Sequence, residues 1–190
     1  MRIKPAVSAT SGVDDPVAPL WRGTVALRVV TFVFATANVL VHTNGYQRPW
    51  LAWTVLGVMA TWSVFTVRSY GRESGRRRWI VITDLAVTCG LMSLSPLIMT
   101  DEQFLRNVPL ITTIWACEPA VAAGALGGQV AGAAAGAAVG LTTYLSRGEF
   151  TVDVLRDVVL LVGAGFLVGM ASTTARRSAV LLAQALRTEA

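Results

Sequence analysis

Six stretches of about 20 mostly apolar residues follow one another through this chain and leave little room for anything else. A helix needs about 20 such residues to cross the hydrocarbon core of a bilayer. The stretches are residues 21–42, 49–68, 79–99, 107–125, 127–146 and 153–172. They predict an all-α fold: a polytopic membrane helix bundle of about six transmembrane helices, followed by a C-terminal cytoplasmic helix. Only residues 124–128 mark a turn between the fourth stretch and the fifth, so a merged or re-entrant pair remains an alternative.

The composition agrees with a multi-pass protein of the plasma membrane, and the lipid bilayer is its expected surrounding. Of 190 residues, 54% are hydrophobic and 14% are charged, whereas soluble domains carry about 25% charged residues. The net charge of +5 comes from basic residues beside apolar stretches, not from a basic face with interleaved aromatic residues. We therefore expect no nucleic-acid partner.

The chain divides into three expected parts. Residues 1–19 contain three prolines and predict a disordered cytoplasmic tail. Residues 20–172 form the six-helix transmembrane domain. Residues 173–190 are rich in strong helix formers and begin a cytoplasmic coiled-coil or signalling helix.

The distribution of Lys and Arg predicts the orientation. With the amino terminus in the cytoplasm, 11 of these residues fall inside and 4 outside, the latter being Arg48, Arg106, Arg147 and Arg156. Because cytoplasmic loops carry the excess of Lys and Arg, both termini are expected to be cytoplasmic.

Three ionisable residues lie within the predicted spans: Arg28, Asp84 and Glu118. Each costs roughly 2.5–3.5 kcal/mol at a helix centre. Counted from the span ends, all three lie about 7–11 Å below the cytoplasmic surface. They predict an intramembrane polar cluster in which Arg28 bridges two carboxylates, the second of which titrates or contacts a ligand. The alternative is a structural ion pair that fixes the helix order, with the third residue reaching toward the interface.

Glycine recurs every fourth residue across the fifth span and returns in the sixth. The positions are Gly124, Gly128, Gly132, Gly136 and Gly140, then Gly165 and Gly169. Small residues at this spacing allow close helix packing, within one chain or across a dimer. A small-residue cavity for a lipid or another apolar ligand is the alternative.

We find no sequence motif for catalysis, for a cofactor or for a metal. Patterns such as HExxH, GxSxG and the P-loop are absent, and the single histidine, His42, lacks companion ligands. The sequence therefore predicts no catalytic, cofactor-binding or metal-binding residues.

Four stretches resemble the amino-terminal membrane region of MacS-type bacterial sensor histidine kinases. They are PLWRGTVALRVVTFVFA at 19–35, ITDLAVTCGLMSLSPLI at 82–98, SRGEFTVDVLRDVVLL at 146–161 and TTARRSAVLLAQAL at 173–186. The resemblance covers about residues 19–190. It implies that 20–172 is a sensor domain that passes an intramembrane or envelope signal through the last helix.

In that family a phosphoacceptor helix and an ATP-binding domain follow, and these 190 residues contain neither. Kinase activity is therefore not expected of the chain itself, and the parent protein implied by the resemblance is a sensor histidine kinase. Its implied partners are a downstream kinase domain, a response regulator and a second copy of the chain. For that homodimer, Ala175, Ala179, Leu182 and Leu186 form a short a/d seam. A surface-lying amphipathic helix is the alternative.

A small transporter or channel subunit is the competing functional hypothesis. It would use Arg28, Asp84 and Glu118 as a coupling site, but such sites are expected near the bilayer midplane. A lipid-modifying enzyme would need polar residues clustered at a membrane face, which the short loops lack. Those loops are also too short for an outer binding domain, so we expect the stimulus to come from the membrane or its surface.

Overall fold

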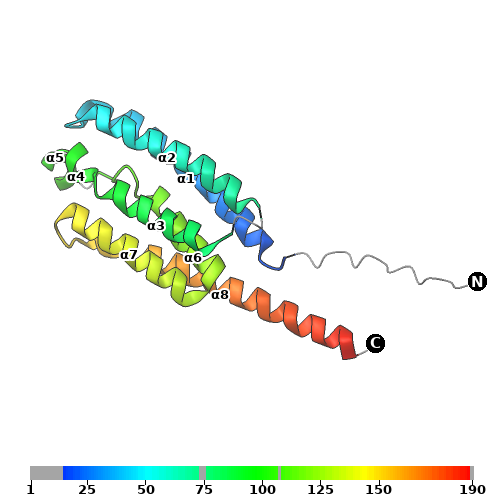
Figure 1. Cartoon of the computed structure of the whole chain (residues 1–190). Coiled ribbons are helices and arrows are strands. Elements are labelled where there is room, and N and C mark those ends of the chain that lie inside the picture. The colour runs from blue at the N-terminus through cyan, green and yellow to red at the C-terminus, as the bar shows by residue number, and fades with distance from the viewer. Residues whose placement is uncertain (1–14, 73–75, 107, 189–190) are drawn as a thin grey trace, which may run out of the picture.

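A computed structural model describes residues 15–72, 76–106 and 108–188, and within these ranges the chain is helical, with no strand. Most of the predicted tail, residues 1–14, lies outside the described residues, as do the last two residues of the predicted signalling helix. The main helices are α1 (Ala18–His42), α2 (Pro49–Tyr70), α3 (Arg78–Met92), α6 (Glu118–Gly127), α7 (Gln129–Arg147) and α8 (Val152–Thr188). They pack side by side as an elongated bundle (Figure 1).

Short elements connect the helices at one end of this bundle. The 3-10 turn Thr43–Gly45 joins α1 to α2, and α4 (Ser95–Ile98) and α5 (Asp101–Leu105) follow α3. Thr100 caps α5 by accepting a hydrogen bond from the Gln103 amide, while the Gln103 side chain accepts one from the Thr100 amide. This reciprocal capping box satisfies two helix-end donors, which keeps so short a helix formed.

Among the described residues, four helical segments are long and apolar enough to cross a membrane, not the six predicted. They are Ala18–Gly45, Pro49–Tyr70, Arg78–Ile98 and Val152–Thr188. The first, second, third and sixth predicted spans are therefore present as membrane-like helices. The fourth and fifth do not meet the same criteria, for two different reasons.

The fourth predicted span is not a continuous helix. Residues 108–110 have no regular secondary structure, residues 111–114 form turns, Trp115–Cys117 form a 3-10 turn, and α6 then contributes only ten residues. Pro119 lies in the first turn of α6, where its missing amide hydrogen costs nothing. All residues from Glu118 to Ala125 are buried by neighbouring helices. In the irregular segment before α6, Leu110, Ile111, Thr112, Trp115 and Ala116 are buried, which fits the rule that non-helical backbone is tolerated at membrane depth only inside protein.

The fifth predicted span is a helix, but its composition is less apolar than that of the other spans. The 19 residues of α7 are long enough to cross, and its many Ala and Gly residues give it a modest hydropathy. It packs most extensively against α8, and also against α6 and α3. Helix α7 is therefore a packing element of the bundle on one face, whereas Val130, Leu141 and Leu145 on its other face are exposed.

The glycine stripe is divided between two helices. Gly124 belongs to α6, and Gly128 stands at the junction with a φ of 81°, a left-handed conformation that favours glycine. The other three glycines lie on α7, so the predicted single helix face is interrupted at Gly128.

Helix α8 closes over this stripe. A Cβ added to Gly136 would lie 2.5 Å from the Leu161 carbonyl oxygen, and one added to Gly124 would lie 2.9 Å from the Gly169 amide nitrogen. Gly132 and Gly165 meet backbone to backbone. The glycines thus allow α8 to approach α6 and α7 within one chain, at distances that larger side chains would prevent.

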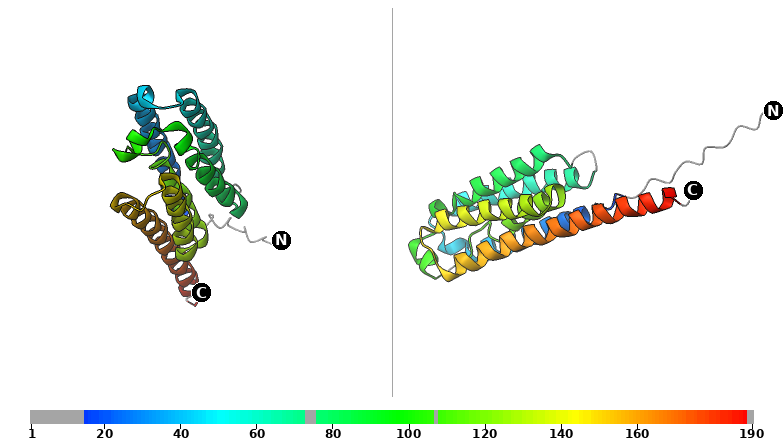
Figure 2. Two further views of the ribbon diagram at one scale, coloured as in Figure 1. Left: turned by 90° about the vertical axis from the view of Figure 1, so that its left-hand side faces the viewer. Right: turned by 90° about the horizontal axis from the view of Figure 1, so that it is seen from below.

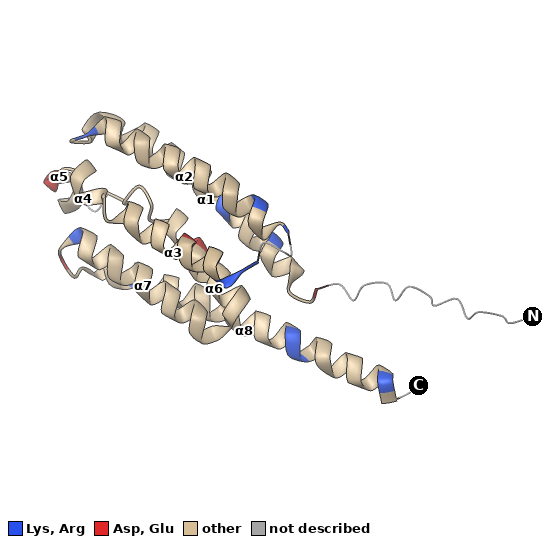
Figure 3. Cartoon of the chain, viewed as in Figure 1, with Lys and Arg blue, Asp and Glu red and all other residues tan. Residues whose placement is uncertain are grey.

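Both ends of the described chain leave from the same end of the bundle, where α8 projects as a single free helix (Figures 1 and 2). Lys and Arg concentrate at this end and along the projecting part of α8 (Figure 3). Nine of the described basic residues lie on this side: Arg22, Arg68, Arg72, Arg76, Arg77, Arg78, Arg176, Arg177 and Arg187. Arg48, Arg106, Arg147 and Arg156 lie at the opposite end.

Candidate functional site

Arg28 of α1, Asp84 of α3 and Glu118 at the start of α6 meet inside the bundle. The Arg28 Nη2 donates to both carboxylate oxygens of Asp84 at 2.5 Å and also to Glu118 Oε2. The three side chains are at most 1% exposed. One guanidinium nitrogen therefore serves two carboxylates, and the contact ties together three helices that are distant in sequence.

Asp84 has further donors on α2. Trp62 Nε1 donates to its Oδ1 at 2.6 Å, and the Tyr70 hydroxyl donates to its Oδ2 at 3.2 Å. Each oxygen of this carboxylate thus accepts at least two hydrogen bonds. Hydrogen bonds of this kind stabilise a buried anion that would otherwise be expensive in an apolar surrounding.

Trp115 covers the other side of the arginine. The Arg28 Cζ lies 4.4 Å from the centre of the Trp115 ring, close enough for a cation–π interaction. The indole Nε1 of Trp115 donates to Ser63 Oγ of α2 at 3.0 Å. The irregular segment before α6 therefore supplies a side chain that an uninterrupted helix would not place in the same way.

Glu118 has fewer hydrogen-bond donors than Asp84. Its Oε1 is buried and, among the described residues, has no hydrogen-bond partner; Nε and Nη1 of Arg28 also have none. If both carboxylates are ionised, the trio carries one surplus negative charge, which a buried site holds only at high cost.

The far end of α6 is tied to α8. Ser172 Oγ donates to the Ala125 carbonyl at 2.7 Å, and Arg176 Nη2 donates to the carbonyls of Ala125 and Leu126 at 2.9 and 3.2 Å. These carbonyls belong to the last turn of α6, where a cation is favourable and acceptors lack helical partners. Helix α6 thus contacts the polar cluster at one end and α8 at the other.

The residues predicted for the output seam lie on the projecting part of α8. Ala175 and Ala179 are half-buried, whereas Leu182 and Leu186 are exposed. Within the described chain, no other helix covers the last two turns of α8 (Figure 2).

Four side chains of the site were not predicted from the sequence: Trp62, Ser63, Tyr70 and Trp115. The available signal was weak, because aromatic residues are common in membrane helices. A tryptophan or tyrosine away from the interface does need a partner for its polar atom, and Trp62 and Trp115 each have one in this site.

Comparison with known proteins shows the family. The model of a family of unknown function, DUF5931, matches residues 13–183, and the chain belongs to this family. No curated protein and no solved structure matches the chain.

Proposed function

We propose that this member of the DUF5931 family is the membrane-embedded input module of a two-component sensor histidine kinase. It passes an intramembrane or envelope signal through α8 to a kinase core outside these 190 residues. The observation that carries the proposal is the length of α8. Its 37 residues extend about 56 Å, against a hydrocarbon core of about 30 Å. The stretches that resemble MacS-type sensor kinases support the same function.

The charge distribution supports an orientation with both termini in the cytoplasm. Nine described basic residues lie at the end from which α8 projects, and four lie at the other end. Because cytoplasmic ends carry more Lys and Arg, the projecting part of α8 lies on the cytoplasmic side. A kinase core and its response regulator would be reached there.

A second copy of the chain is the proposed partner of α8. Leu181, Leu182 and Leu186 are each more than 60% exposed on a helix that has left the bundle. Exposed leucines on a helix in water favour association with another helix. The seam that starts at Ala175 and ends at Leu186 has the a/d spacing of a parallel pair.

The signal route in this proposal runs through α6. A change in the pairing of Glu118 with Arg28 would move the start of α6, and its last carbonyls are held by Ser172 and Arg176 of α8. A small shift of α6 would therefore displace α8 where it leaves the bundle. Rigid packing on the glycine stripe would pass that displacement along the helix.

A small transporter or channel subunit is the second candidate, favoured by the unpartnered Glu118 Oε1. A coupling site of this kind needs access to water from one side at a time. The burial of Arg28, Asp84 and Glu118 closes them to both sides in this structure. The sensor function therefore remains our proposal.

The test is a fusion of the chain to a kinase core of known autophosphorylation rate, with alanines added one at a time after Thr188. Each added residue rotates the output by about 100°. We expect autophosphorylation to rise and fall with a period of about 3.6 residues and to return after seven additions. A smooth decline without periodicity would contradict transmission through a continuous helix.

A matched pair of variants tests the link to α6. Arg176→Gln removes the contact with the α6 carbonyls, whereas Arg177→Gln removes the same charge from an exposed neighbour. We expect only the first to change the resting output of the fusion. Equal effects would indicate a general charge effect at the membrane surface and would exclude the α6 route.

A further inference from the structure

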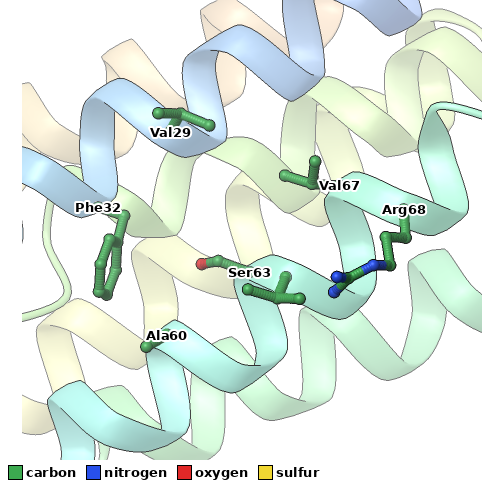
Figure 4. A pocket seen from close by; sticks show the side chains of 7 residues that line it. Val29, Phe32, Ala60, Ser63, Val67 and Arg68 are labelled. Atoms are coloured by element: carbon green, nitrogen blue, oxygen red, sulfur yellow. The ribbon is translucent and has the colours of Figure 1, made fainter.

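An apolar groove runs between α1 and α2 on the outer surface of the bundle (Figure 4). Its volume is about 440 Å³, within the range of about 300–1,000 Å³ that is typical of small-molecule sites. The apolar lining comes from both helices: Val29, Phe32, Ala60, Val64 and Val67. Two valines of this set, Val29 and Val64, are about half exposed, so the groove opens toward the surrounding lipid.

One cation lines this groove. Arg68 lies in the last turn of α2, and Figure 4 shows its side chain running back along the helix toward the groove. Among the described residues its guanidinium has no hydrogen-bond or ion-pair partner. Arg76 and Arg28, by contrast, both have carboxylate partners. A cation at one end of an apolar groove is complementary to an amphiphile with an anionic head.

The depth of the groove matches a lipid in one leaflet. Ala60 lies eight residues before Arg68, about 12 Å deeper along the helix axis. Arg68 lies in the last turn of α2, near the basic end of the bundle, where headgroups are expected. An acyl chain would therefore lie over Ala60, Val64 and Phe32 while its phosphate meets Arg68.

We propose that this groove binds one anionic phospholipid, with an acyl chain between α1 and α2 and the phosphate on Arg68. Arginine suits this role because its planar donors pair with phosphate oxygens. The lining holds no carboxylate that would compete for the cation.

The floor of the groove is connected to the polar cluster. Ser63 is 8% exposed, lines the groove and accepts the hydrogen bond from Trp115, whose ring covers Arg28. A bound chain would rest on the residue that positions Trp115. If the proposed sensor function holds, the lipid is its input; the binding itself does not depend on that function.

The experiment measures lipid binding to the purified 190-residue chain by native mass spectrometry. The probes are palmitoyl-oleoyl phosphatidylglycerol, the matching zwitterionic phosphatidylcholine, and inorganic phosphate. We expect one phosphatidylglycerol to bind preferentially and inorganic phosphate to leave that binding unchanged. Arg68→Gln should weaken phosphatidylglycerol binding about fivefold, the factor expected for one basic residue near an anionic surface. Arg68→Lys should retain most of the preference.

Two matched controls make the result specific. Arg177→Gln removes a cation from α8, away from the groove, and should leave binding unchanged. Ala60→Phe fills the groove with Arg68 intact and should abolish binding, whereas Val58→Phe adds the same ring on a part of α2 that does not line the groove. A photoactivatable acyl chain on phosphatidylglycerol should label the α2 segment around Val64.

Several outcomes would overturn the proposal. One is that Arg68→Gln and Arg177→Gln weaken phosphatidylglycerol binding equally, and another is that Ala60→Phe binds this lipid as the wild type does. The others are that inorganic phosphate alone competes with the lipid, or that the photoactivatable chain labels residues outside α1 and α2. If binding behaves as expected but the kinase fusion does not respond to phosphatidylglycerol, the lipid site stands and the sensor function fails. If no lipid binds but the fusion responds to another stimulus, the sensor function stands and the lipid site fails.

Discussion

Replacing Arg28 by alanine should cost more stability than any other single change in the polar cluster. The substitution leaves Asp84 and Glu118 buried with no cation. Removing one partner of a buried ion pair costs about 3–5 kcal/mol. The stacking of Arg28 on Trp115 is lost as well, and it contributes about 0.5–2 kcal/mol. We therefore expect the free energy of unfolding to fall by an amount near the upper end of the range of about 3–5 kcal/mol.

The two carboxylates should differ, because their surroundings differ. Asp84→Asn weakens the hydrogen bonds that Arg28, Trp62 and Tyr70 donate. It also replaces one acceptor oxygen by an amide nitrogen, which is itself a donor and cannot accept from them. Hydrogen bonds to charged groups are worth about 1.5–3 kcal/mol each, so a loss of about 2–3 kcal/mol is expected. Glu118→Gln keeps one acceptor for Arg28 and removes the surplus charge, so its cost should be about 1 kcal/mol or less.

The assay is reversible unfolding of the purified chain in mixed micelles of a mild detergent and dodecyl sulfate, followed by circular dichroism. In the Arg28→Ala background, Glu118→Gln should recover at least about 1 kcal/mol, because it removes one of two uncompensated charges. A larger cost for Glu118→Gln than for Asp84→Asn would refute this account. Wild-type stability of Arg28→Ala would refute the cluster as a stabilising element.

Three further predictions follow from the packing of α8 and the charge distribution. Gly165→Ala should destabilise the chain by about 1–3 kcal/mol in the same assay through overpacking, because its Cβ would meet the α7 backbone. Gly163→Ala adds a Cβ in open space on the same helix and should be neutral or stabilising. Insertion of two glycines after Thr174 should uncouple the kinase fusion while circular dichroism stays unchanged, and an unaltered response would exclude the continuous-helix mechanism. In a background without native cysteines, an impermeant thiol reagent applied outside cells should label Glu102→Cys but not Arg72→Cys, and the reverse pattern would invert the proposed topology.

The sequence was sufficient to predict the helical class, and the three charged residues that it assigned to one layer are in contact in the structure. Counting residues from the span ends placed Arg28, Asp84 and Glu118 in one layer, and in the structure the three side chains are in contact. This succeeds because the rise of a membrane helix is regular, so sequence position translates into depth. The long terminal helix was predicted from an unbroken run of helix formers, and the structure describes it as helical from Val152 through Thr188.

Rotation and backbone breaks could not be predicted in the same way. The fourth span contains enough apolar residues for a helix, yet residues 108–117 fold irregularly, and neighbouring helices bury five of them: Leu110, Ile111, Thr112, Trp115 and Ala116. Nothing local to the sequence reports that burial. The aromatic partners of Asp84 were missed for a related reason: the face that α2 turns toward α3 is set by packing, and no periodic polar pattern marks it.

The break before α6 accounts for several features of the site together. Because α6 begins at Glu118, the carboxylate lies at a helix amino terminus, where the backbone dipoles favour an anion. The same break allows Trp115 to cover Arg28. It also shortens the helix to about 15 Å, so its last carbonyls end where α8 leaves the bundle and can be held by Ser172 and Arg176. If the fourth span were a full-length helix, Glu118 and those carbonyls would lie on one continuous helix that reaches both membrane faces. In the proposed signal route, this half-length helix would pass a change in the pairing of Glu118 with Arg28 to α8.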